Sequence, residues 1–216
     1  MKYNALKLFG EDILSEAKGF STLCLTGNRW GGKAILIALD ACLDSSGLNY
    51  FTVVVPKVKE FADKYVKWGK IGCCKDFKNI KMTELLKIFN NPRIWGAMHD
   101  VCSFLASENN EIEFKKLMHW AENADPYKIK EDYIGRIKGV GINTFQYLRI
   151  QSGIDTIMPD KVITKWIGKI DGKVNNPYEC IEKGMKIAEY MGITGMELCW
   201  AIWIKESGEL NHIEIE

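Results

Sequence analysis

The chain has 216 residues, a formal net charge of +1, and contents of 47% hydrophobic and 26% charged residues. These values are typical of a globular protein with its own core, and they exclude disordered and fibrous classes. No apolar run approaches the roughly 20 residues of a membrane span. The N-terminus also lacks the apolar core of a signal peptide. We therefore expect a cytoplasmic monomer with no membrane partner.

Hydrophobic periodicity and turn residues predict an all-α chain. Residues 51–55 have strand propensity, but they lack a partner strand, so we expect them to begin a helix. Thr194 and Glu197 have the spacing of a capping box at the start of the last helix. The predicted helices cover residues 3–17, 34–43, 51–67, 82–89, 92–106, 111–122, 126–134, 143–151, 160–170 and 177–191, with one more from Thr194.

Seven cysteines are scattered along the chain, mostly within apolar stretches. This distribution predicts reduced, buried thiols. The adjacent Cys73 and Cys74 lack a second cysteine pair or a histidine at ligand spacing, so we expect no zinc site.

The segment Gly139, Val140 and Gly141 falls between two predicted helices. Missing Cβ atoms allow a tight turn there and the close approach of another backbone. Amides near the start of the second helix can bind an anion without any side chain. Residues 126–173 hold nine Lys or Arg against five Asp or Glu, a local basic surplus. The combination favours a nucleic-acid phosphate backbone, and the alternative is a turn used only for packing.

Together with Asp160, nineteen residues after Gly141, this hairpin resembles the helix-hairpin-helix of the endonuclease III-like DNA glycosylase superfamily. Members carry a Leu-Pro-Gly-Val-Gly hairpin and, at a similar distance, an Asp that opens the next helix. The resemblance covers residues 125–206, including the Leu-Cys-Trp-Ala-Ile-Trp run near its end. It implies a two-lobed helical bundle forming one glycosylase-like unit. Its expected parts are an N-terminal lobe at 1–124, the hairpin and Asp160 region at 125–175, and C-terminal helices at 176–216.

The resemblance implies that Asp160 is the catalytic residue. Cleavage of an N-glycosidic bond develops positive charge on the sugar, and a fixed carboxylate can stabilise this charge and deprotonate a water. Asp160 at a helix start is also a good N-cap, so capping alone stays open. Helix amides are expected to keep the carboxylate ionised. Lys165 occupies the place where relatives carry Arg or Lys.

Bifunctional members of the superfamily carry a nucleophilic lysine two residues after the hairpin. Asn143 stands at that position, which implies a monofunctional enzyme in which Asn143 contacts the base or orders water. The residues expected to bind DNA are Lys138, Gly139, Val140, Gly141, Asn143, Lys161 and Lys165.

Related hairpins hold a monovalent cation through three backbone carbonyls, which map onto Gly135, Ile137 and Val140. The resemblance thus implies a Na⁺ or K⁺ site that bridges to a DNA phosphate. Some members hold an iron–sulfur cluster on four cysteines near the C-terminus. Only Cys180 and Cys199 lie there, so we expect no cluster and no other cofactor.

The sequence therefore predicts a monofunctional DNA glycosylase that excises a damaged or mismatched base flipped out of double-stranded DNA. A non-catalytic helix-hairpin-helix DNA-binding protein is the alternative, and a helical protein unrelated to DNA is a third reading. The Gly-rich loop at Trp30, with Arg29 and Lys33, could also approach DNA. A surface turn with one packed Trp is the competing interpretation of that loop.

Overall fold

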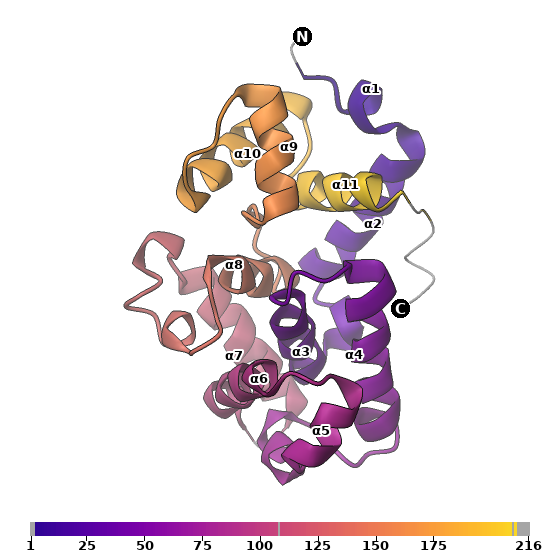
Figure 1. Ribbon diagram of the computed structural model, residues 1–216, viewed down its shortest axis with the longest axis vertical. Helices are drawn as coiled ribbons and strands as arrows, with labels where there is room; N and C mark the ends of the chain where they lie inside the picture. The colour runs from indigo at the N-terminus through magenta and orange to yellow at the C-terminus, as the bar shows by residue number, and fades with distance from the viewer. Residues whose placement is uncertain (1–2, 108, 209, 211–216) are drawn as a thin grey trace. The chain divides into compact units, whose positions relative to one another are not determined.

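The computed structural model describes residues 3–107, 109–208 and 210. It confirms the all-α prediction, because these residues form helices and turns and no strand occurs among them (Figure 1). Contacts divide the chain into a terminal unit, Met1–Arg29 with Arg149–Glu216, and a central unit, Trp30–Leu148. This division does not follow the expected boundaries at 124 and 175. In the described part of the chain, no helix combines the length and apolarity that a membrane crossing requires.

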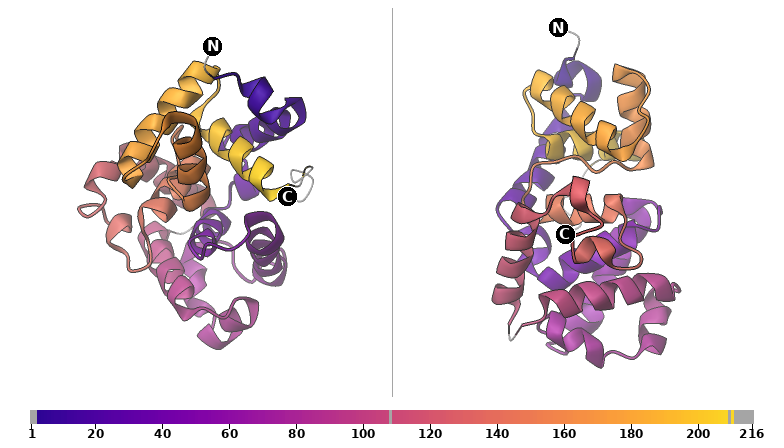
Figure 2. Two further views of the ribbon diagram at one scale, coloured as in Figure 1. Left: turned by 45° about the horizontal axis from the view of Figure 1, so that its top comes forward. Right: turned by 90° about the vertical axis from the view of Figure 1, so that its left-hand side faces the viewer.

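The terminal unit joins the two ends of the chain. Helix α11 packs along α2, and α9 and α10 pack beside each other and against α11 (Figures 1 and 2). The helices of this unit are α1 (Ala5–Phe9), α2 (Glu11–Leu25), α9 (Lys161–Asp171), α10 (Pro177–Met191) and α11 (Gly195–Ser207).

Aromatic rings and one arginine form the core between α2 and α11. Phe20 stacks on Trp200 with ring centroids 4.4 Å apart. The guanidinium of Arg29 lies 5.3 Å from the Phe20 centroid and 5.4 Å from the Trp200 centroid, and the side chain is completely buried. A guanidinium is weakly hydrated and stacks well on aromatic faces, which favours such a place. The interpretation in which Arg29 approaches DNA was therefore wrong.

The central unit is built around α3 (Ala34–Asp44), which contacts α4, α6 and α7 (Figure 1). Residues 34–43 are all buried, and nine of these ten residues are apolar, as is typical of a core helix. The other α-helices of this unit are α4 (Val55–Phe61), α5 (Met82–Ile88), α6 (Pro92–Leu105) and α7 (Asn110–Asn123), and α8 (Ile142–Gln151) runs from here into the terminal unit. The shorter 3-10 segments are η1 (Arg29–Gly32), η4 (Cys74–Asn79), η5 (Pro126–Lys128) and η6 (Ile134–Arg136).

The run with strand propensity is helical, as predicted. It forms a π-helix, η2 (Tyr50–Val54), which leads through α4 into a second π-helix, η3 (Ala62–Val66). Asn49 begins the run, because its side chain accepts the amide of Thr52 at 2.9 Å. Pro56 lies in the first turn of α4, where a missing N–H is tolerated.

Two helix predictions were wrong. The helix expected over residues 3–17 is broken at Gly10, whose φ of +84° is open to glycine, and α2 then runs through Gly19 to Leu25. A helical glycine costs about 1 kcal/mol, and burial of the neighbouring Phe20 offsets that cost. The helix expected over 126–134 is instead the two short 3-10 turns η5 and η6.

The remaining predicted helices agree with the structure to within one or two residues at each described end. The capping box at α11 is confirmed, since the Glu197 amide donates to Thr194 Oγ1 at 3.0 Å and the Thr194 amide donates to Glu197 Oε2 at 2.8 Å. All seven cysteine side chains are buried, which confirms that they are core residues.

Candidate functional site

The hairpin is a tight turn between η6 and α8 in the central unit. The Val140 amide donates to the Ile137 carbonyl at 3.0 Å, and the Phe145 amide donates to the Gly141 carbonyl at 2.9 Å as α8 begins. Gly139 has a φ of +110°, and a Cβ on it would lie 3.2 Å from Ala97 Cβ on α6. The fold therefore requires glycine at 139 for both its backbone conformation and its packing.

Gly141 has no comparable structural requirement. Its φ is not positive, and a Cβ there would meet no atom within 4 Å. The residue is exposed and directly precedes α8, where helix amides and the helix dipole favour an anion. The space in front of Gly141 is thus open to a group from outside the protein.

The turn uses part of the surface expected to bind DNA. Val140 is among the residues expected to bind DNA, but its amide donates to the Ile137 carbonyl and its side chain is buried. The Ile137 carbonyl keeps a second lone pair. The predicted carbonyl site at Gly135, Ile137 and Val140 therefore stays a prediction. Gly135 is required for packing, since its Cβ would lie 2.1 Å from the Ile129 oxygen.

Polar side chains flank the turn. Arg136 and Lys138 are exposed on either side of Ile137, and Asn143 is half-buried in the first turn of α8. The hairpin thus combines two cations, an exposed glycine and a helix start, which suits an anionic backbone.

Asp160 is the N-cap of α9, in the terminal unit. Its Oδ1 accepts the amide of Ile163 at 2.7 Å, and its Oδ2 accepts the indole N–H of Trp203 at 2.8 Å. The half-buried carboxylate is therefore held through both oxygens, and the backbone of Val162 adds a further hydrogen bond. Trp203 is half-buried and reaches Asp160 from α11, a contact that no local sequence pattern predicts.

Burial raises the pKa of Asp160 above its ordinary value of 3.8, although the hydrogen bonds from Ile163 and Trp203 act in the opposite direction. Desolvation penalises the charged form of a carboxyl group, whereas donors stabilise it. The helix amides do stabilise the charged form, and burial is the larger effect. The environment therefore raises the pKa of Asp160, which makes its carboxylate a better proton acceptor.

Thiols lie close to this carboxylate. Thr164 Oγ1 donates to Cys180 Sγ at 3.4 Å, and burial raises the pKa of Cys180 to about 11 despite that bond, with Asp160 contributing in the same direction. Burial also raises the pKa of Cys199, and the charge of Asp160 adds to the effect. Both thiols are therefore protonated at neutral pH, when they are poor nucleophiles.

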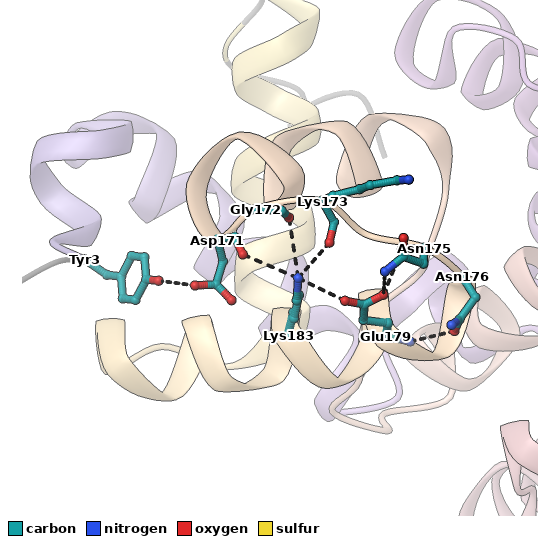
Figure 3. Close-up of polar contacts among 8 residues, drawn as sticks. All are labelled: Tyr3, Asp171, Gly172, Lys173, Asn175, Asn176, Glu179 and Lys183. Atoms are coloured by element: carbon teal, nitrogen blue, oxygen red, sulfur yellow. Dashed lines mark hydrogen bonds and ion pairs between the residues drawn. The ribbon is translucent and has the colours of Figure 1, made fainter.

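The other end of α9 is fixed by a lysine from α10 (Figure 3). Lys183 Nζ donates to the carbonyls of Asp171, Gly172 and Lys173 at 3.4, 3.5 and 2.8 Å, and pairs with Glu179 Oε1 at 3.0 Å. An ammonium at a helix C-terminus satisfies carbonyls that have no partner in the helix. Asp160 thus stands on a helix that is tied at both ends.

The predicted DNA-binding residues divide between the two units. Lys138 and Asn143 lie in the central unit with the rest of the hairpin. Asp160 and the exposed Lys161 and Lys165 lie in the terminal unit.

The Trp30 loop follows the competing interpretation. Trp30 is 9% exposed, and its indole N–H donates to Asp40 Oδ2 at 2.7 Å. Tyr50 donates to the same oxygen at 2.9 Å. The backbone of Trp30 has a φ of +51°, in the left-handed region that a bulky residue rarely adopts. Burial and the hydrogen bond from its indole to Asp40 hold it there. Trp30 is a packed residue.

Over residues 3–107, 109–208 and 210, no group of three or more His, Cys, Asp or Glu side chains could hold a metal ion. No family model matches the chain, and comparisons with curated proteins and with solved structures give no significant match. The likeness to the glycosylase superfamily therefore remains a likeness of motif and spacing, carried by Gly139, Gly141 and Asp160.

Proposed function

We propose that this chain binds double-stranded DNA through its hairpin and hydrolyses the N-glycosidic bond of a flipped base with Asp160. The observation that carries the proposal is the state of Asp160: a half-buried carboxylate, fixed through both oxygens, with a raised pKa. Positioned carboxylates with a raised pKa are typical of general acid–base sites.

The hairpin would supply the binding. A DNA phosphate approaches the open space at Gly141, accepts hydrogen bonds from amides at the start of α8, and is neutralised by Lys138 and Arg136. This use accounts for a glycine at 141 that neither φ nor internal packing requires.

Asp160 would supply the chemistry. The carboxylate has about four lone-pair sites, and the bonds from Ile163, Trp203 and Val162 leave one of them for a water. As the bond between sugar C1′ and the base nitrogen breaks, the carboxylate stabilises positive charge on the sugar. The water oxygen bonds to C1′ and passes a proton to Asp160, and the departing base takes a proton from solvent. Asn143 cannot form a Schiff base, so the product is an abasic site in an intact strand.

One observation favours a second candidate, a non-catalytic DNA-binding module. Both oxygens of Asp160 accept bonds that also stabilise the fold, from the first turn of α9 and from Trp203. Helix capping and packing against α11 therefore account for an Asp at this position without catalysis.

Incubation with duplexes that carry alkylated, oxidised, deaminated or mismatched bases, followed by alkali, separates the two functions. The proposal expects strand breaks with the wild type and none with Asp160→Asn. Trp203→Phe removes the indole bond and keeps the carboxylate, so it separates loss of this bond from loss of the carboxylate. The binding module would be established instead by two results together. The wild type would break no duplex more than Asp160→Asn does, and the two proteins would bind DNA with equal affinity.

A further inference from the structure

A cavity of about 200 Å³ lies beside the hairpin, within the central unit. One wall is the end of α3 at Ser45 and Ser46, and another is the start of α6 at Asn91 and Arg93. Gly139 of the hairpin closes it on the third side. This arrangement joins three segments far apart in the chain, so no local sequence pattern predicts it.

The cavity carries a positive charge next to the hairpin. A Cβ on Gly139 would lie 3.8 Å from the Arg93 carbonyl oxygen and 3.9 Å from Arg93 Cγ, so the arginine stem adjoins the turn. The Arg93 side chain is exposed. No acidic residue is among those that line the cavity, so its net charge is that of Arg93.

The other polar groups leave both donors and acceptors for a ligand. Asn91 Oδ1 accepts the Arg93 amide at 3.1 Å, which leaves the N–H groups of the same carboxamide. The hydroxyls of Ser45 and Ser46 donate to the carbonyls of Cys42 and Leu43, each at 2.6 Å, so their oxygens remain acceptors. A ligand that combines an anion with N–H groups matches this set.

The volume limits what the cavity can hold. Sites for complete small molecules occupy roughly 300–1,000 Å³, and this cavity is smaller. It therefore suits one portion of a longer ligand. The adjoining hairpin is the surface where we place the DNA backbone.

We propose that this cavity, which we call the Arg93 pocket, binds one nucleotide of the DNA strand that the hairpin contacts. Its phosphate pairs with the Arg93 guanidinium, whose planar fork matches two phosphate oxygens. The inference rests on the proposed DNA binding by the hairpin and adds a contact that the hairpin motif does not contain.

Fluorescence anisotropy with a labelled short duplex over a salt series tests the Arg93 pocket. Arg93→Met is expected to lower the slope of log affinity against log salt by about 0.9, which corresponds to roughly eightfold weaker binding at 0.1 M salt. Arg93→Lys keeps the slope, because the charge remains, and gives an intermediate affinity because the fork is lost. Lys78→Met is the matched control, since it removes an exposed cation of the same unit that does not line the cavity.

The outcomes distinguish this inference from the proposed function. If Arg93→Met behaves like Lys78→Met while Lys138→Met lowers the slope, the Arg93 pocket is wrong and hairpin binding stands. If the wild type shows no salt-dependent affinity for the duplex, the proposed function fails and the pocket fails with it. Thermal unfolding of both Arg93 variants shows whether they are folded, and Arg93→Lys gives a second measurement of the slope.

Discussion

The indole N–H of Trp203 donates to Oδ2 of Asp160 at 2.8 Å, although the two residues are 43 positions apart in the sequence. This bond connects α11 to the N-cap of α9 within the terminal unit. It stabilises the charged form of the carboxylate against the effect of burial.

Replacement of Trp203 by Phe is therefore expected to raise the pKa of Asp160 further. It should also lower the free energy of unfolding by about 1–3 kcal/mol, because a half-buried acceptor loses its partner. Carbon-detected NMR titration of the Asp160 carboxyl measures the first effect, and denaturant unfolding measures the second. A pKa equal to or below that of the wild type would contradict the role given to the indole.

The raised pKa of Asp160 also predicts how stability changes with pH. Because the folded state holds this proton more tightly than the unfolded chain, protonation favours folding. The contribution of Asp160 to stability is thus greatest below its ordinary value of 3.8 and is lost as the pH rises through the raised folded value. Unfolding of the wild type and of Asp160→Asn, compared across this window, isolates the contribution. A wild type that gains stability relative to Asp160→Asn as the pH rises would mean that the folded pKa is lowered instead.

The same shift fixes the acid limb of activity. If Asp160 acts as the base, base excision falls as the pH drops through its raised pKa, which lies above that of an ordinary Asp. Trp203→Phe should move this limb to higher pH. A limb that stays in place in the variant would assign it to another group.

The two glycines of the hairpin should respond in opposite ways to alanine. Gly139→Ala is expected to cost about 1–3 kcal/mol of stability, since its φ of +110° disfavours any side chain. The new Cβ would also crowd Ala97 at 3.2 Å. Gly141→Ala should unfold at the same denaturant concentration as the wild type or a slightly higher one, yet bind duplex DNA more weakly. Denaturant unfolding and anisotropy measure both. Wild-type affinity in Gly141→Ala would exclude a close phosphate contact at this turn.

Local signals in the sequence were sufficient for most helices. Thr194 with Glu197, and Asp160 after Pro159, locate helix starts because a cap needs only the neighbouring amides. Local signals could not show which of the two glycines, Gly10 or Gly19, interrupts the helix. The fold breaks at the first and continues through the second because α2 buries Phe20 against Trp200, a contact between the two ends of the chain.

Only the parts of the candidate site that are local in sequence could be predicted. The hairpin and Asp160 are each short motifs, so the pattern of residues is sufficient to find them. Trp203 beside Asp160 and Arg93 beside Gly139 depend on packing between distant helices. The balance of burial against hydrogen bonds at Asp160 depends on the same packing, so the direction of its pKa shift could not be predicted from the sequence.

The contacts of Lys183 predict a final, purely structural effect, on the stability of the helix that Asp160 caps. Lys183→Met removes the ammonium from the carbonyls of Asp171, Gly172 and Lys173, so the end of α9 loses its donors. We expect a loss of about 1 kcal/mol in the free energy of unfolding and faster hydrogen exchange in the last turn of α9. Lys186→Met is the matched control, since it removes an exposed lysine of α10, the helix that also carries Lys183. It should change the free energy of unfolding by less than about 0.5 kcal/mol. Equal stability and exchange in the two variants would mean that Tyr3, which donates to Asp171 Oδ1 at 2.7 Å, is sufficient to hold this end of α9 (Figure 3).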